Sequence, residues 1–136
     1  MNCGWTEFIA AYEDFIRNEI MTIFNTNSII YQAFPSYRIQ LPNNIAVGGN
    51  LTDRDDRYGW HKDTDENYNH PPFEYNFIVP LTEARDTASV YIETNPESNK
   101  FVPAKMNVGE FFSFMGGSCI HGNKPNRTGK TRVSFD

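Results

Sequence analysis

Short strand-like runs separated by turn residues occupy the chain from residue 37 almost to its end, and they constrain the fold most strongly. Each run is rich in β-branched or aromatic residues and is bounded by Gly, Pro, Asn or Asp, which is typical of short strands. The runs are 37–41, 74–81, 89–93, 110–115 and 131–135. Many short strands with polar loops predict a mostly β sandwich or jelly roll.

One helix is expected before these strands, over residues 6–24, with Thr6 as its N-cap. Its apolar residues recur at steps of three and four, as on one face of a helix. They are Phe8, Ile9, Tyr12, Phe15, Ile16, Ile20 and Ile23. We therefore expect an N-terminal helix that backs the β structure.

Length and charge limit the classes of protein that this chain can belong to. A length of 136 residues predicts a single domain spanning 1–136. The net charge of −5 argues against a nucleic-acid partner, because a phosphate backbone favours a basic surface. No apolar run is long enough to span a membrane and no signal peptide is visible, so we expect a cytoplasmic protein. The two cysteines do not form a disulfide framework and are expected to be free thiols.

A candidate metal site comes from two of the three histidines. His61 and Asp63 are two residues apart, so on an extended segment both side chains point to the same face. His121, which follows the run 110–115, is the expected third ligand. Two histidines and one carboxylate on one side of an ion form the facial triad of non-haem Fe(II) oxygenases. A lone His-x-Asp is more often a solvated surface pair, and the decision between these interpretations depends on the C-terminal residues.

The C-terminal residues resemble a known family. His61-x-Asp63, the distal His121, Arg132 eleven residues later and Ser134 beyond it look like the Fe(II)/2-oxoglutarate-dependent dioxygenases. The nearest type is the hydroxylase of streptomycin biosynthesis, with phytanoyl-CoA hydroxylases more distant. The matching segments lie at 60–63, 70–82 and 119–136, and the resemblance runs from about Ile39 to the end.

This resemblance implies a fold, a reaction and a set of site residues. The fold is a double-stranded β-helix, which is jelly-roll or cupin-like, and the catalytic metal ligands are His61, Asp63 and His121. The cofactors are Fe(II), the co-substrate 2-oxoglutarate, and O2, and the reaction hydroxylates a C–H bond of a small organic substrate with release of succinate and CO2. Arg132 and Ser134 hold the distal carboxylate of 2-oxoglutarate, and their i, i+2 spacing on a strand lets both reach one anion. The retained Asp63 distinguishes the chain from halogenating relatives, in which a halide replaces the carboxylate.

Four further features are interpreted with alternatives left open. Asn76, in the run 74–81, either helps to anchor the co-substrate or makes a structural hydrogen bond. His70 is not at ligand spacing and is most simply exposed, whereas Cys119 is most simply a buried thiol. The polar and aromatic stretch 53–70 is expected to be a loop that lines the site.

Two alternatives to the oxygenase remain on the same scaffold. One is a cupin-type metal protein without oxygenase activity, which gives no reason for Arg132 and Ser134. The other is a sugar-binding jelly-roll module, which gives no reason for an intact triad. The chain is shorter than is usual for the resembled family, so it is expected to be either a minimal enzyme or one truncated at its C-terminus. An uncovered sheet edge would favour a homodimer over a monomer.

Overall fold

The computed structural model describes residues 3–45 and 58–136. By its internal contacts the chain divides into two compact units, Met1–Pro35 and Ser36–Asp136, and each unit is described by itself. No helix of the described residues is both long and apolar enough to cross a membrane.

The first unit is helical. The helix runs through α1 (Cys3–Phe15), a π-helical turn η1 (Ile16–Ile20) and α2 (Met21–Ile23). The N-terminal helix is therefore confirmed, but it begins before Thr6, and the assignment of Thr6 as the N-cap is wrong. The segment after the helix folds back along it, since the Trp5 and Phe34 rings stack 6.0 Å apart and the Tyr12 hydroxyl donates to the Gln32 carbonyl at 2.8 Å.

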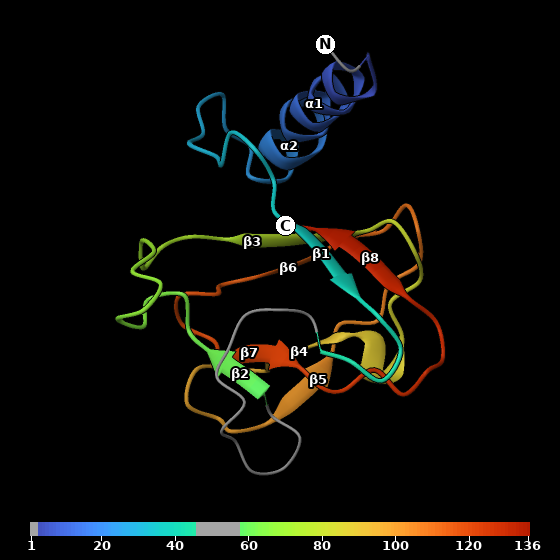
Figure 1. Ribbon diagram of the computed structural model, residues 1–136. Coiled ribbons are helices and arrows are strands. Elements are labelled where there is room, and N and C mark those ends of the chain that lie inside the picture. The colour runs from blue at the N-terminus through green and yellow to red at the C-terminus, as the bar shows by residue number, and fades with distance from the viewer. Residues whose placement is uncertain (1–2, 46–57) are drawn as a thin grey trace. The chain divides into compact units, whose positions relative to one another are not determined.

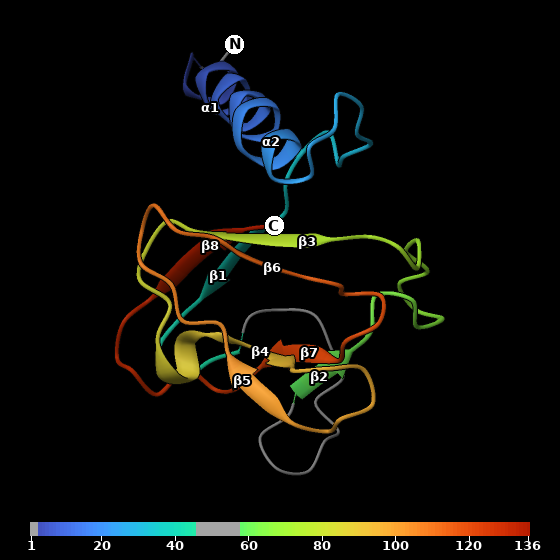
Figure 2. The same ribbon diagram turned by 180° about the vertical axis from the view of Figure 1, so that it is seen from behind.

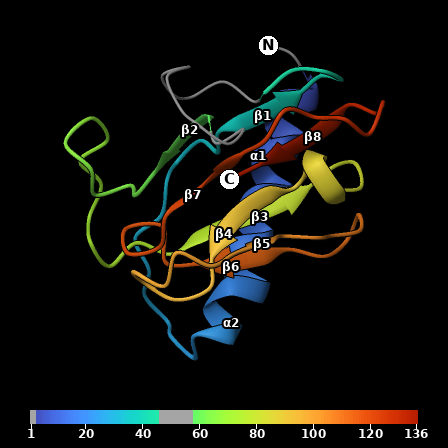
Figure 3. The same ribbon diagram turned by 90° about the horizontal axis from the view of Figure 1, so that it is seen from below.

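The second unit consists of two four-stranded antiparallel sheets, which lie as two layers facing each other (Figures 1 and 2). The first sheet has the order β1-β8-β3-β6, and the second has the order β2-β7-β4-β5 and is nearer to the viewer in Figure 3. A short 3-10 helix, η2 (Asp86–Ala88), precedes β4. The strands are β1 (Tyr37–Gln40), β2 (Tyr58–His61), β3 (Asn76–Pro80), β4 (Val90–Glu93), β5 (Phe101–Pro103), β6 (Phe112–Phe114), β7 (His121–Asn123) and β8 (Arg132–Phe135).

The expected strands and the observed strands agree in five places. The runs 37–41, 74–81, 89–93, 110–115 and 131–135 contain β1, β3, β4, β6 and β8, each somewhat shorter than expected. The mostly β class is therefore confirmed. Sequence reasoning missed β2, β5 and β7, which are three or four residues long and become strands by pairing with neighbours.

The expected site loop at 53–70 is only partly a loop. Its first residues, 53–57, lie outside the described residues, and 58–61 form strand β2, so the assignment of the whole stretch as loop is wrong. From Asp63 to Tyr68 the chain does turn, and this part carries one of the candidate ligands.

An apolar core lies within the second unit. Buried side chains from both sheets and from the connections between them form it: Ile78, Ala84, Val90, Ile92, Ala104, Met106 and Cys119. Phe112 and Phe114 of β6 pack against this cluster. The core supports the inner faces of both sheets, and the polar side chains of the candidate site occupy those same faces.

Candidate metal centre

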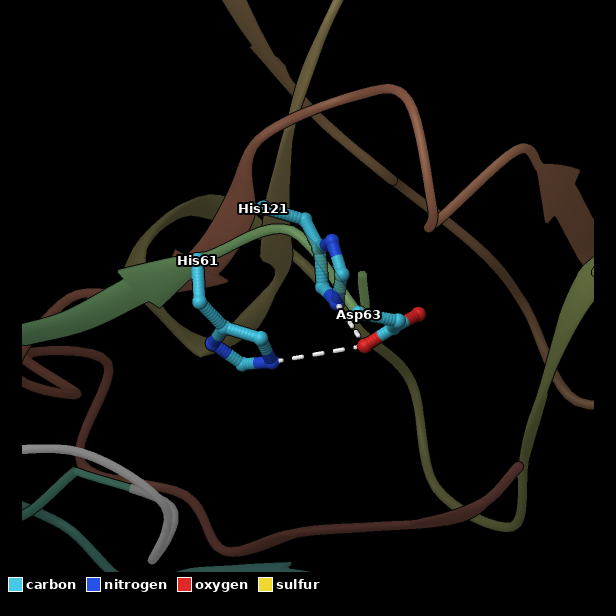
Figure 4. Close-up of side chains that lie close together, drawn as sticks. All are labelled: His61, Asp63 and His121. Carbon is cyan, nitrogen blue, oxygen red and sulfur yellow. Dashed lines mark ion pairs between the residues drawn. The ribbon is translucent and has the colours of Figure 1, made fainter. Parts of the chain in front are cut away.

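Neighbouring strands bring the two candidate histidine ligands together. β2 and β7 are antiparallel, and His61 pairs directly with His121 in their register. The two imidazole rings have centroids 4.6 Å apart. Asp63 follows β2 by two residues, and its Oδ1 lies 3.4 Å from Nε2 of each histidine. Figure 4 shows the three side chains converging on one point from two segments far apart in the sequence.

Backbone carbonyls orient both imidazole rings. Nδ1 of His61 lies 2.7 Å from the Gly59 carbonyl oxygen, and Nδ1 of His121 lies 3.1 Å from the Cys119 carbonyl oxygen. A carbonyl can only accept, so each Nδ1 carries the proton and each Nε2 keeps its lone pair when the ring is neutral. Metal-binding histidines commonly have such a partner on the second nitrogen, because it fixes both tautomer and ring orientation.

Asp63 is held by contacts different from those expected. It lies at the start of a turn, not on an extended segment, so strand alternation does not explain why it joins His61. Its backbone N–H donates to the Gly116 carbonyl at 3.0 Å, and its Oδ2 accepts from the Asn76 amide at 2.7 Å. Oδ2 is therefore occupied by Asn76, and Oδ1 is the oxygen that faces the histidines.

Gly116 makes room for this arrangement. A Cβ built on it would overlap Asp63 Oδ2 and would lie 2.6 Å from Asn76 Nδ2. Gly116 and Gly117 lie in the turn between β6 and β7. The lack of a side chain at Gly116 is therefore a requirement of the Asp63–Asn76 pair.

The electrostatic surroundings keep Asp63 ionised. Burial alone would raise the pKa of its carboxyl, but the contacts of Oδ1 with His121 and His61, whose rings attract the carboxylate when they are protonated, hold that pKa far below its usual range. Burial would lower the pKa of His61, whereas its contact with Asp63 raises it above the ordinary value. The site therefore presents one permanent negative charge between two imidazole nitrogens.

The three residues fit a single metal ion. Their ligand atoms all lie within 4.8 Å of one another. Two ligands that each sit about 2.1 Å from an ion and about 90° apart are about 3 Å from each other, close to the 3.4 Å separations here. Two histidines and a carboxylate are the donor set of non-haem iron oxygenases, and other divalent transition metals accept the same set.

Arg132 and Ser134 lie on the inner face of the opposite sheet. Both are on β8, and their fractional exposures are 1% and 0%. The pocket lined by His61 and His121 is also lined by Arg132, Ser134 and Asn76. The structure thus brings all six residues predicted for the site to one pocket or its wall, with Asp63 in contact with Asn76.

The Arg132 guanidinium is buried, and no carboxylate of the described residues is in hydrogen-bonding contact with it. It donates to Asn123 Oδ1 at 3.1 Å and to Ser134 Oγ at 3.3 Å, both neutral acceptors, and its Nε has no partner within the described part of the chain. Burial lowers the Arg132 pKa to about 10. A buried charge with incomplete pairing is costly, and an anion in the pocket would relieve that cost.

Two other residues considered from the sequence lie outside this pocket. His70 is on the surface, where its Nδ1 contacts Glu74 Oε2 at 2.8 Å. Cys119 is a buried member of the apolar core, and burial raises the pKa of its thiol. Its contribution to the site is the backbone carbonyl that orients His121.

Glu93 is a supporting residue that sequence reasoning missed. It is 2% exposed, and its carboxylate accepts from the backbone N–H of Asn99 at 2.7 Å and of Ile120 at 3.2 Å. Ile120 immediately precedes His121, so Glu93 braces the start of β7. An acidic residue in the otherwise apolar run 89–93 was the signal that could have identified it.

Glu93→Gln is expected to destabilise the metal-free protein by about 1–3 kcal/mol at pH 7, because the backbone N–H groups of Asn99 and Ile120 lose a charged acceptor. Burial would raise the Glu93 pKa, but the backbone N–H groups of Asn99 and Ile120 lower it. A carboxyl group whose pKa is lower in the folded state stabilises the fold at pH values above its unfolded-state pKa of about 4.3. This stabilisation is lost as the pH falls through the folded-state pKa. Urea unfolding at pH 7 and near pH 3 should therefore show a difference from wild type that shrinks in acid. Glu97→Gln, an exposed change in the same loop, is the control, and an equal loss in both variants would contradict the role of Glu93.

Comparison with known proteins adds one relative. No family model matches the chain. The chain is 33% identical over 110 residues to the streptomycin biosynthesis protein StrG of Streptomyces griseus. The match covers 81% of this chain but only 46% of StrG, so the chain spans less than half the length of that relative.

Proposed function

We propose that this chain is an enzyme, a non-haem Fe(II)- and 2-oxoglutarate-dependent oxygenase that hydroxylates a C–H bond of a small organic substrate. The observation that carries the proposal is the pairing of two features in one pocket. One is the His61, Asp63 and His121 cluster, and the other is the buried Arg132, whose hydrogen-bond partners are neutral acceptors. A metal site alone would fit many proteins, but a metal site facing a buried guanidinium suits a ligand that chelates metal at one end and carries a carboxylate at the other.

The fold supports the same proposal. Apart from the consecutive strands β4 and β5, the strands alternate between the two sheets along the chain, with β1, β3, β6 and β8 in one sheet and β2, β4, β5 and β7 in the other. This alternation is how a double-stranded β-helix, or jelly roll, is built. The similarity to StrG, a biosynthesis protein, also supports an enzyme. That the substrate is a small organic molecule is part of the proposal.

Each residue has a separate role in the proposed reaction. His61, Asp63 and His121 would hold Fe(II), which with 2-oxoglutarate and O2 supplies oxidation of a C–H bond with release of succinate and CO2. Asn76 holds Asp63 Oδ2, so a single carboxylate oxygen faces the metal position. Arg132 and Ser134 would bind the distal carboxylate of the co-substrate, and the buried surroundings strengthen that charge-assisted contact.

The proposal is tested by adding Fe(II) and 2-oxoglutarate to the protein without oxygen and recording the visible spectrum. We expect a metal-to-ligand charge-transfer band in the wild type. Arg132→Ala should weaken the band at a given 2-oxoglutarate concentration by about tenfold or more, because it removes a charge-assisted bidentate partner. Fe(II) affinity itself should be unchanged in this variant, since Arg132 is not one of the three ligands.

The alternatives give different results in this experiment. A cupin-type metal protein would bind Fe(II) without producing the band. A sugar-binding module would bind neither Fe(II) nor 2-oxoglutarate, and either result would overturn the proposal. Succinate formation in the presence of oxygen then provides the readout for substrate screening.

A further inference from the structure

A second guanidinium lies on the wall of the same pocket, and it is already paired. Arg38 of β1 donates from Nε and one Nη to the two carboxylate oxygens of Asp136, at 2.9 and 3.0 Å. Both residues line the pocket, and their side chains are 44% and 25% exposed. A fork of two parallel bonds is the strongest geometry for an arginine and a carboxylate.

The sheet register places this pair beside the proposed anion site. Arg38 is directly opposite Ser134, and Gln40 is directly opposite Arg132, in the antiparallel pairing of β1 and β8. Arg38 and Ser134 therefore share the face that carries Arg132. The backbone N–H and carbonyl of Asp136 also pair with Ser36, which holds Asp136 at the end of this sheet.

The charges of the pair act on Arg132 in opposite directions. Burial is the largest influence and lowers the Arg132 pKa, Asp136 raises it, and Arg38 lowers it. Asp136 is thus a carboxylate close enough to stabilise the Arg132 charge, while Arg38 offsets that stabilisation. With the pair intact, the two effects oppose each other and leave Arg132 available to an external anion.

We propose that Arg38 keeps this pocket open to the distal carboxylate of a dicarboxylic 2-oxo acid, by neutralising the Asp136 carboxylate that would otherwise compete with the ligand for Arg132. This inference rests on the proposed function and adds a positioning role for the Arg38–Asp136 pair to it. Without Arg38, the Asp136 carboxylate repels the incoming distal carboxylate. Without Asp136, Arg38 loses its carboxylate partner and adds a second positive charge to the wall.

The two single variants are therefore expected to have opposite effects. In anaerobic titrations of the Fe(II)-loaded protein, Arg38→Gln should raise the dissociation constant for 2-oxoglutarate by roughly three- to tenfold, and Asp136→Asn should lower it by a similar factor. The double variant should return close to wild type, because both charges are gone. All these differences should shrink as the salt concentration rises, since partly exposed charges are screened.

A control variant and two possible outcomes distinguish this inference from a purely structural role of the pair and from a failure of the proposed function. Arg85→Gln removes one positive charge from an exposed position outside the pocket and should leave the dissociation constant unchanged. If both single variants weaken 2-oxoglutarate binding, the pair is only a structural clamp and the inference is overturned while the oxygenase proposal stands. If the wild type itself does not bind 2-oxoglutarate, the proposed function fails and this inference fails with it.

Discussion

Replacing His121 by alanine should weaken Fe(II) binding by more than about a hundredfold and abolish the charge-transfer band and succinate formation. His121 supplies one of the three ligands of the cluster, and its Nε2 lies 3.4 Å from Asp63 Oδ1. Loss of a residue that merely orients a metal ligand typically costs about 10- to 100-fold in affinity or activity, so loss of a ligand should cost more. Anaerobic Fe(II) titration and iron content after desalting measure the effect.

The matched control for this experiment is His70→Ala. His70 is an exposed histidine that contacts Glu74 on the surface, and it does not belong to the cluster. Its loss should change Fe(II) affinity by less than about twofold, because a surface ion pair contributes little. Equal iron content in His121→Ala and wild type would show that the metal position lies elsewhere, and the proposed function would then have no support.

Replacing Gly116 by alanine should disrupt the centre without removing any ligand. The added Cβ would overlap Asp63 Oδ2 and would lie 2.6 Å from Asn76 Nδ2. Asp63 is buried and hydrogen-bonded to the half-buried Asn76, so the overlap must be relieved by moving the carboxylate or the turn. We expect a loss of about 1–3 kcal/mol in the free energy of unfolding and a parallel loss of Fe(II) affinity. Urea unfolding and anaerobic Fe(II) titration measure the two effects.

Gly4→Ala is the control for the change of residue type. Gly4 lies in helix α1, and outside its chain neighbours and the surrounding helix backbone no atom of the described residues comes within 4 Å of a Cβ added there. Alanine favours a helix over glycine, so this variant should differ from wild type by less than about 1 kcal/mol, in the stabilising direction. Wild-type iron affinity in Gly116→Ala would mean that Asp63 does not need its observed position to bind the metal.

The strands that the sequence predicted and those that it missed differ in a physical way. The runs that became β3 and β4 carry several apolar residues bounded by turn residues, so their own composition identifies them. β7, in contrast, is His121-Gly122-Asn123, and none of these residues favours a strand. It is a strand because β2 and β4 pair with it on both sides.

The candidate site shows the same division. Residue type and spacing proposed His61, Asp63 and His121 as ligands, and the resemblance to the dioxygenases implied the roles of Arg132 and Ser134. The contacts that position these side chains cannot be recognised in the same way. Asp63 was expected to join His61 by strand alternation, but it reaches the cluster through a turn that is hydrogen-bonded to Gly116 and Asn76. The Asn76 amide, for which a contact with the co-substrate was one expectation, donates to the carboxylate ligand.

The sequence by itself determined the mostly β class and proposed the histidine and carboxylate ligands of the candidate site, because both depend on local patterns. Periodicity identifies a helix, turn residues delimit strands, and ligand types limit the metals that can bind. Only the tertiary structure decided which groups meet. Four features of the candidate site join residues that are distant in sequence or that no sequence motif marks. They are the His61–His121 register, the carbonyls that orient both rings, the carboxylate of Glu93 that holds the start of β7, and the Arg38–Asp136 pair. The pairing of strands and the burial of charge are properties of the folded chain, and no local pattern encodes them.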